Sequence, residues 1–541
     1  MGNPHRRAIA PALRTALLLA FISLVILFAH ITFGGVHAQN SMPAANPDGV
    51  SVAASADDQL ALLQTGSGES DAAGVNASGA SPGASPSPAA DIAAAQPTPG
   101  EKSVRERVRE MPFTADRLIG LLGILVVLGM CYLVSNNRGA IEWRLVVVGL
   151  LLQVIIAVLI LKTDTGYAVF DWLGQRINDL LTFSNEGAKF VFGRLVDTTY
   201  LDAVTPAGGD AGALKGKYGF IFAFTITATI IFVSSLFSIL YHLGVMQRVV
   251  YGLAWAMQRT MKSISGAEAL TVAAEVFMGQ TEAPLTIAPY IPRLTKSELL
   301  AMMIGGMGTV SGGILAVYVS FGIDPVFLLT TSVMSAPACL LISKMLYPET
   351  EVPETAGVVN LKSERIDANI IDATARGAGE GLRLALNVMA VLIAFIALVA
   401  MVNAILGWAG GLLGINALLG TPFSLQTIFG YLFAPLAFVM GVPWVDAVRV
   451  GDLLGTKLVL NEVVSYVKLA GIEDQLNPRS VLIATFALCG FANIASVGII
   501  IGGIGGLAPE RRSDLARLGW RALFGGFLAT CLTATLAGLL S

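Results

Sequence analysis

Long apolar runs alternate with short polar connections from about residue 117 to the end of the chain. Eight of these runs are long enough to cross a membrane, because a hydrocarbon layer of about 30 Å needs about 20 apolar residues in a helix. The eight runs cover residues 117–135, 145–162, 218–242, 299–322, 325–346, 383–406, 480–507 and 515–540. The amphipathic stretch 168–195 and the short stretch 425–441 suit helices in the membrane interface. The pattern predicts an all-α, polytopic membrane protein with eight transmembrane helices and interfacial helices.

Composition agrees with this class and excludes several others. Of the 541 residues, 55% are hydrophobic and 13% are charged, whereas globular domains carry roughly 25% charged residues. The net charge of −3 provides no basic surface, so we expect no nucleic-acid partner. Three of the four histidines lie in the first 40 residues and all four cysteines lie inside apolar runs. We therefore expect no metal centre built from histidine or cysteine, and no enzyme activity.

The two ends of the chain differ in character. Residues 1–38 combine early arginines, an apolar stretch and a small-residue exit, which predicts a signal peptide or an uncleaved N-terminal membrane segment. Residues 39–100 are rich in Ala, Ser, Pro and Gly, which predicts a disordered tail. Residues 101–216 should form the N-terminal membrane helices and an interfacial helix. Residues 217–541 should form a transport core.

Polar residues interrupt the apolar pattern twice, in the same way. In the first half, the polar stretch 274–284 precedes a Gly-rich span around 305–313. In the second half, the stretch 457–462 precedes a span whose middle, 489–498, contains Gly, Asn and Ser. Each stretch predicts a re-entrant helical hairpin followed by a broken span. Irregular backbone at membrane depth persists only where it lines a wet cavity or is buried in protein.

The spacing of these polar residues indicates an inverted repeat. Glu282 and Glu462 are 180 residues apart, and Thr309 and Asn493 are 184 apart. Two inverted repeats, 217–348 and 379–541, are typical of secondary transporters, and carboxylates inside a membrane are functional candidates. The alternative is that both glutamates have a structural role, pairing with Lys457 or with backbone.

The predicted site is rich in hydrogen-bond acceptors. Its members are Glu282, Glu462, the amides Gln280 and Asn493, the hydroxyls Thr281 and Ser496, and the aromatic ring of Phe491. Such a site suits a neutral, hydroxyl-rich ligand with a flat part, and it would repel anions unless a cation intervened. Phe491 suits ordinary helix packing equally well.

The same residues resemble the concentrative nucleoside transporter family. Gly279–Leu285 with Pro289 and Tyr290 is similar to the first hairpin of that family, and Leu460–Glu462 to its second. Cys489–Asn493 is similar to its unwound seventh span. Further agreement occurs at 336–338, 347–351 and 508–513, so the resemblance covers about 117–541.

The resemblance implies symport of a nucleoside across the inner membrane of a bacterium, driven by sodium or protons. It also implies a homotrimer in the lipid bilayer, each protomer having two re-entrant hairpins. A related solute, nucleobase-like or sugar-like, is the alternative substrate. By resemblance, Gln280, Thr281 and Glu282 face the base with Ile314 near it, Glu462, Asn493 and Ser496 hold the ribose hydroxyls, and Phe491 walls the ribose.

The resemblance also implies a site for the coupling ion. It would be formed by Glu275, the hydroxyl of Thr309 and the backbone carbonyls of Met278 and Val310. In the family the first of these positions is Asn, so Glu275 is a departure. A carboxylate can bind a hard cation through oxygen or take up a proton, and the choice between sodium and protons stays open here.

Overall fold

The computed structural model describes residues 106–108, 111, 115–196, 221–356 and 367–541, and every element in these ranges is a helix. Contacts divide the chain into residues 1–85 and 86–541, so the described residues all belong to the second unit. The segments predicted as signal peptide and disordered tail lie outside the described residues. The all-α class is confirmed for the described part.

The N-terminal helices supply two apolar helices and one amphipathic helix. They are η1 (Ala115–Leu118), α4 (Ile119–Val134), η2 (Arg138–Ala140), α5 (Trp143–Leu161), α6 (Asp164–Phe192) and η3 (Gly193–Val196). Thr163 caps α6, its hydroxyl accepting from the Gly166 amide at 3.0 Å. Helix α6 thus begins four residues before the amphipathic stretch predicted at 168–195.

The middle of the chain forms the first hairpin and the first broken span. Its helices are α9 (Phe222–His242), α10 (Val245–Thr260), α11 (Gly266–Glu275), η4 (Ala283–Arg293), α12 (Lys296–Gly308), α13 (Gly312–Ser320) and α14 (Pro325–Leu346). Helices α11 and η4 pack against each other, and we call residues 266–293 hairpin 1. Helices α12 and α13, separated at 309–311, form broken span 1.

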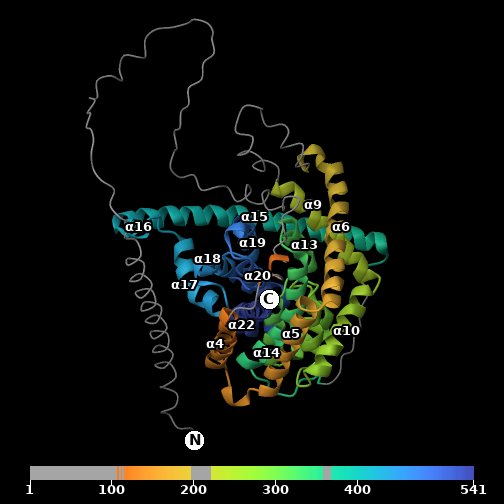
Figure 1. The fold of residues 1–541 in the computed structure, drawn as a ribbon. Coiled ribbons are helices and arrows are strands. Elements are labelled where there is room, and N and C mark those ends of the chain that lie inside the picture. Colours follow the sequence, from red (N-terminus) through yellow and green to blue (C-terminus); the bar gives the residue numbers. More distant parts are fainter. Residues whose placement is uncertain (1–105, 109–110, 112–114, 197–220, 357–366) are drawn as a thin grey trace, which may run out of the picture. The chain divides into compact units, whose positions relative to one another are not determined.

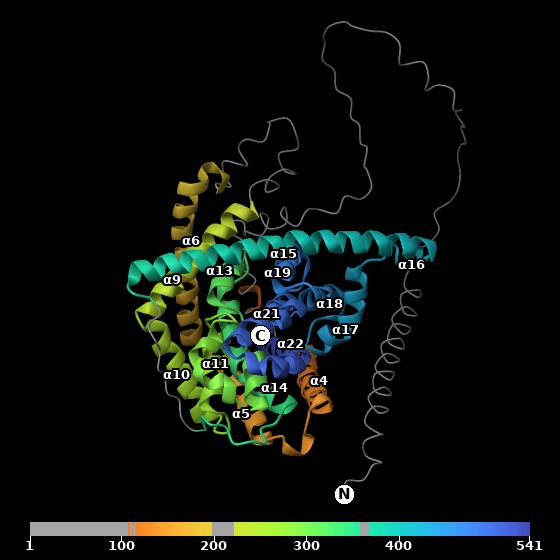
Figure 2. The same ribbon diagram turned by 180° about the vertical axis from the view of Figure 1, so that it is seen from behind.

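The remaining helices repeat this plan. They are α15 (Ile370–Leu412), α16 (Ile415–Leu419), α17 (Leu425–Val439), α18 (Trp444–Val459), α19 (Glu462–Ile472), η5 (Glu473–Gln475), α20 (Pro478–Leu488), α21 (Ile494–Leu507), η6 (Pro509–Arg511) and α22 (Arg512–Leu540). Helices α18 and α19 pack together as hairpin 2, residues 444–472, and α20 with α21 forms broken span 2. Helix α15 runs from α9 to α16 and α17 (Figures 1 and 2).

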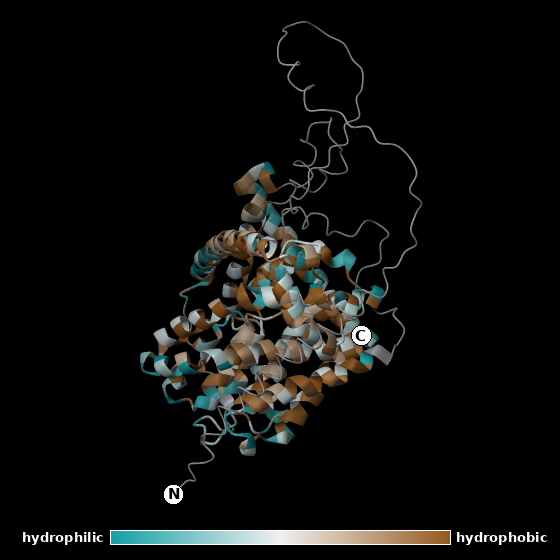
Figure 3. Cartoon of the chain, turned by 90° about the vertical axis from the view of Figure 1, so that its left-hand side faces the viewer, coloured by the Kyte–Doolittle hydropathy of each residue, from teal (hydrophilic) through white to brown (hydrophobic). Residues whose placement is uncertain are grey.

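The structure has fewer helices of membrane-spanning length and composition than the eight apolar runs predict, among the residues it describes. Six described segments are long and apolar enough to cross a membrane, with broken span 1 counted as one segment, or seven if the pair α17 and α18, bent by 118°, counts as one span. Helix α4 has only 16 residues, and broken span 2 is divided into helices of 11 and 14 residues. Hydrophobic residues line most of the described helices (Figure 3). The described part is a polytopic helical membrane protein.

Helix α22 joins the two broken spans in the core. It packs against α12, α14, α20 and α21, and most of its residues from Leu515 onward are buried. Glycines permit the close approach: a Cβ on Gly526 would lie 2.6 Å from the Cβ of Met307 at the end of α12. The breaks in both spans are therefore held against one rigid helix.

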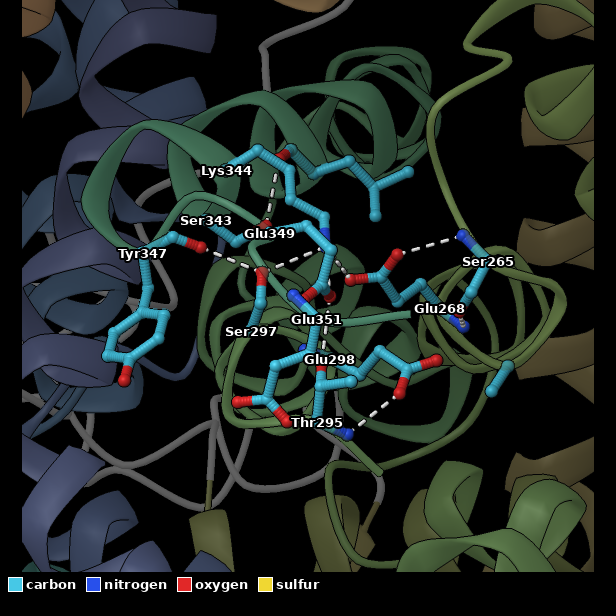
Figure 4. A network of polar contacts seen from close by, with 12 residues as sticks. Ser265, Glu268, Thr295, Ser297, Glu298, Ser343, Lys344, Tyr347, Glu349 and Glu351 are labelled. Carbon is cyan, nitrogen blue, oxygen red and sulfur yellow. Dashed lines mark hydrogen bonds and ion pairs between the residues drawn. The ribbon is translucent and has the colours of Figure 1, made fainter. Parts of the chain in front are cut away.

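A buried polar network fixes the base of hairpin 1 (Figure 4). The Lys344 ammonium at the end of α14 lies 2.5 Å from a carboxylate oxygen of Glu268 in the first turn of α11. It also donates to the Ser297 hydroxyl at 2.9 Å and to Glu349 at 3.4 Å. Capping boxes begin both α11 and α12 beside it. The starts of hairpin 1 and of broken span 1 are thereby tied to α14.

Candidate functional site

The interruptions in broken span 1, hairpin 2 and broken span 2 each end at a capping residue. The Ser311 side chain accepts from the Ile314 amide to begin α13, at 3.5 Å. Asn461 begins α19 by accepting from the Val464 amide at 2.9 Å, and Asn493 begins α21 in the same way. Ser and Asn are preferred at this position because their oxygens satisfy amides that lack an intrahelical partner. The polar residues therefore set where each half-helix starts again.

Four of the predicted substrate residues join in a hydrogen-bonded chain across three elements. The Asn493 amide donates to Glu462 Oε2 at 3.1 Å, and Asn493 Oδ1 accepts from the Ser496 backbone amide at 2.9 Å. The Gln280 amide in the loop of hairpin 1 donates to the Ser496 hydroxyl at 3.4 Å. Tyr318 of α13 adds a fifth member, its hydroxyl donating to Glu462 Oε1 at 3.2 Å. All five side chains are buried, and we call them the polar chain.

Glu462 occupies an electrostatically favourable place in this chain. It is the first residue of α19, where the unpaired amides of a helix N-terminus stabilise negative charge. Tyr318 and Asn493 both donate to its carboxylate, so a ligand hydroxyl would meet an acceptor that is already oriented. The sequence interpretation did not include Tyr318. Its spacing from Ile314, one helical turn along the same apolar run, was the available signal.

The other predicted substrate residues lie beside a cavity or at the breaks. Thr281 and Glu282 line a cavity of about 500 Å³, where Glu282 is exposed and accepts from the Gly279 amide at 3.3 Å. Ile314 is buried in the first turn of α13, and Phe491 is half-buried at the break in span 2. Gln280 and Thr281 are consecutive, so the cavity and the polar chain meet at the loop of hairpin 1.

One face of α15 also lines this cavity. Arg376, Glu380, Arg383 and Asn387 recur at helical spacing and all line it. Arg376 donates to both carboxylate oxygens of Asp367, at 2.6 and 2.9 Å, and this guanidinium holds the pKa of Asp367 below its ordinary range. Arg376 and Glu380 precede the span that was predicted to start at residue 383, and no role was predicted for Arg383 or Asn387 inside it.

Phe237 and Tyr241 of α9 add aromatic rings to the wall of the same cavity. Ligand pockets typically measure about 300–1,000 Å³ and combine apolar or aromatic walls with a few polar groups. The cavity has this composition and lies within that range of size.

The predicted coupling-ion residues gather where hairpin 1 meets broken span 1. Glu275 is fully buried at the end of α11, and neither of its carboxylate oxygens has a hydrogen-bond partner among the described residues. It touches α12: a Cβ on Gly305 would lie 1.8 Å from Glu275 Oε2. The Thr309 hydroxyl donates to the carbonyl of Gly305 at 2.8 Å. Val310 is buried beside Thr309, and Met278 is half-buried beside the cavity.

The structural alternative for the two glutamates, pairing with Lys457 or with backbone, is met only in part. Lys457 donates to the Ala487 carbonyl at 2.7 Å and to the Thr530 hydroxyl at 3.0 Å, whereas Glu282 accepts from the backbone amide of Gly279. The Phe491 amide donates to the Thr309 carbonyl at 3.2 Å. The breaks of the two spans, far apart in the sequence, are therefore in direct contact.

Comparison with known proteins assigns most of the described chain to one family. Residues 122–195 and 327–538 match the N-terminal and C-terminal models of the Na+ dependent nucleoside transporter, and 223–324 match a model described as nucleoside recognition. An uncharacterized transporter, YutK, of Bacillus subtilis is 42% identical over 78% of this chain and 99% of that protein. The human sodium/nucleoside cotransporter 1 is 38% identical over 79% of this chain and 64% of its own length.

Solved structures agree with these matches. CNTnw in an inward-facing, substrate-bound state is 38% identical, with a TM-score of 0.71, over 79% of this chain and 98% of that chain. An outward-facing variant of the same protein has a TM-score of 0.72 over 97% of its length. With the family models covering three consecutive parts of the chain, this multi-pass membrane protein belongs to the concentrative, Na+ dependent nucleoside transporter family.

Proposed function

We propose that the protein is a sodium-coupled symporter that imports nucleosides across the inner membrane of a bacterium. Membership of the family supports transport rather than enzyme chemistry, and the similar proteins include sodium/nucleoside cotransporters and bacterial transporters. The observation that carries the substrate class is the polar chain next to a cavity of about 500 Å³. A cavity with oriented carboxylate and amide groups suits a ligand that has both hydroxyls and a flat polar ring.

The polar chain is suited to the ribose. Tyr318 and Asn493 both donate to Glu462, so its carboxyl group would be oriented to accept from a sugar hydroxyl, and Asn493 and Ser496 would complete the contacts. Hydrogen bonds to a charged acceptor contribute about 1.5–3 kcal/mol each. Phe491, half-buried at the break, would pack against the sugar.

The loop of hairpin 1 is suited to the base. Gln280 can donate and accept, and its Oε1 has no hydrogen-bond partner among the described residues, so it is available to a base edge. Thr281 and Glu282 add a hydroxyl and a carboxylate on the cavity side. Ile314 would supply apolar contact to the ring. Cavity-lining Arg376, Glu380, Arg383 and Asn387 would face the substrate as it passes α15.

The coupling ion would bind at Glu275. A buried carboxylate without a partner is strongly destabilising, so a cation at this position would remove a large electrostatic penalty. Sodium prefers oxygen ligands, as other hard cations do. The carboxylate of Glu275, the hydroxyl of Thr309 and the carbonyls of Met278 and Val310 would hold it. The family description as Na+ dependent favours sodium over protons.

We further propose eight crossings, formed by α4, α5, α9, broken span 1, α14, α15, broken span 2 and α22. Hairpins 1 and 2 would enter from opposite sides, in inverted repeats at 217–348 and 379–541 of a transport core, 217–541. The parallel order of hairpin, broken span and closing helix supports this assignment. A homotrimer, with 101–216 preceding the core in each protomer, is the proposed assembly.

Uptake by purified protein in liposomes tests the function. Labelled uridine and adenosine are offered with a sodium gradient, a proton gradient or neither, and empty liposomes are the control. Accumulation of at least one nucleoside, driven by sodium alone, is the expected result. Accumulation driven only by protons would exclude sodium coupling. A protein that accumulates neither nucleoside under any gradient, but accumulates a free nucleobase or sugar, would favour the related solute instead.

A further inference from the structure

Hairpin 2 buries a lysine at the place where hairpin 1 buries a glutamate. Glu275 is the last residue of α11, and Lys457 lies in the last turn of α18. Both side chains are fully buried. Glu275 touches Gly305 in the last turn of α12, whereas Lys457 bonds to Ala487 in the last turn of α20. In both halves, the first limb of a hairpin thus presents one charge to the C-terminal end of a half-helix.

A helix C-terminus favours positive charge. Its last four carbonyls have no intrahelical donor, and together they carry a partial negative charge. At the end of α20, hairpin 2 supplies donors from both limbs. Lys457 donates to the Ala487 carbonyl at 2.7 Å, and the Tyr466 hydroxyl of α19 donates to the Thr485 carbonyl at 2.8 Å. At this junction the protein itself therefore supplies the donors and the positive charge that the end of α20 favours.

The junction at the end of α12 has the opposite chemistry. Its buried charge is a carboxylate, both of whose oxygens lack a hydrogen-bond partner among the described residues. Hairpin 1 also contributes an acceptor through the Phe277 carbonyl, to which the Gly312 amide donates at 2.9 Å. A carboxylate beside a helix C-terminus is unfavourable unless a cation lies between them. This junction therefore needs a cation or a proton that the neighbouring residues do not supply.

We propose that Lys457 is a fixed cation that holds hairpin 2 on broken span 2, in the place that hairpin 1 fills with the coupling ion. The proposal rests on the proposed function, which supplies that ion. Only the junction of hairpin 1 with α12 then depends on sodium, and the junction of hairpin 2 with α20 needs none. Lys457 is a positioning residue: it fixes the loop that carries Glu462, five residues further on.

Hydrogen exchange on the wild-type protein in nanodiscs tests this asymmetry without any substitution. Backbone amides of residues 305–312 and of residues 481–488, the last turns of α20, are compared in sodium chloride and in choline chloride. Replacing sodium by choline should speed exchange in 305–312 by about tenfold or more, because local opening there loses its cation, and should leave 481–488 within about twofold. Equal responses in the two segments, or a larger response in 481–488, would overturn the proposal.

Substitutions test the role of the charge in transport. In Lys457→Asn, the new side-chain oxygen joins the Ala487 carbonyl and the Thr530 hydroxyl, so a second sodium can replace the ammonium. Uptake should then require more sodium, and its Hill slope should rise from about 1 toward 2. Lys457→Met provides no ligand, so sodium should not restore its uptake. The matched control is Lys468→Met. Lys468 belongs to the same hairpin, and its ammonium pairs with Asp452 at 2.7 Å.

The outcomes separate this proposal from the function on which it rests. Lys468→Met should keep the wild-type sodium curve. A Lys457→Met protein with that same curve would overturn the fixed-cation role. Should both Lys457 variants fail to fold, the hydrogen-exchange comparison on the wild-type protein still decides. Absence of sodium-driven nucleoside uptake by the wild-type protein would refute the proposed function alone, because the exchange contrast does not require transport.

Discussion

Replacing Glu462 by Gln removes one charge from the polar chain while keeping the shape of the side chain. Wild-type Glu462 accepts from Tyr318 and from the Asn493 amide, at 3.2 and 3.1 Å. The amide nitrogen of Gln is itself a donor, so it would face either the Tyr318 hydroxyl or the Asn493 amide, each of which donates to Glu462 in the wild type. Tyr318 can turn its hydroxyl to accept, but Asn493 cannot turn its amide, because its Oδ1 already caps α21 by accepting from Ser496. The Gln oxygen would therefore face Asn493 and the Gln nitrogen would face Tyr318, so the substitution weakens the acceptor while both contacts of the polar chain can still form.

The expected loss follows from the hydrogen bonds. A hydrogen bond to a charged acceptor contributes about 1.5–3 kcal/mol, so losing one to a ribose hydroxyl should weaken nucleoside binding about 10- to 150-fold. A ligand that lacks that hydroxyl has no such bond to lose. For 2′,3′-dideoxyuridine the same substitution should change affinity less than about threefold.

Equilibrium binding of uridine and 2′,3′-dideoxyuridine to purified protein in saturating sodium measures both effects. The control is Glu473→Gln, the same chemical change just beyond the end of α19 and outside the polar chain. It should leave both affinities unchanged. Equal weakening of the two ligands by Glu462→Gln would show that the substitution acts on folding of the site and not on ribose contacts. An unchanged uridine affinity would remove Glu462 from the proposed binding site.

Three further substitutions test other parts of the structure. Gly305→Ala should lower the Tm and remove its rise with sodium, because the new Cβ would lie 1.8 Å from Glu275 Oε2; thermal unfolding with sodium or choline measures this, and a normal sodium effect would contradict it. Lys344→Met should destabilise the protein by about 3–5 kcal/mol, since Glu268 would stay buried without its partner. Denaturant unfolding measures that loss, and a change below about 1 kcal/mol would refute it. Asn387→Leu should lower maximal uptake severalfold with little change in equilibrium uridine affinity, because Asn387 lines the cavity and is not part of the polar chain.

Much of the fold could be predicted from the sequence, because apolar runs and capping residues are local signals. The breaks in both spans coincide with Ser and Asn caps, which the polar stretches already marked. The start of α15 was predicted 13 residues too late, since its first turns are polar. Those turns are held by the pairing of Arg376 with Asp367 and by contact with α9, and neither long-range contact leaves a periodic signal.

Several of the residues predicted for the site lie close together in the structure, but the connections between them could not be predicted. The matched spacing of Glu282 and Glu462 identified both hairpin loops. However, only Glu462 belongs to the polar chain. Glu282 instead lines the cavity, as residues of α15 do. The partner of Lys457 could not be found from side-chain patterns, because it is the backbone carbonyl of Ala487, which any residue would supply.

The contact between the two breaks provides a physical route from the ion to the substrate. Sodium at Glu275 would order the end of α12, whose Thr309 carbonyl accepts from the Phe491 amide, and Asn493 two residues on donates to Glu462. Coupling between two binding sites is reciprocal, so sodium should raise uridine affinity by the factor by which uridine raises sodium affinity. Titrating uridine at several sodium concentrations, and sodium at several uridine concentrations, measures both factors. In Glu275→Gln the factor by which sodium raises uridine affinity should fall to about 1, because the amide lacks the charge that holds the ion. A variant that kept the wild-type factor would show that the energy passes between the sites by another route.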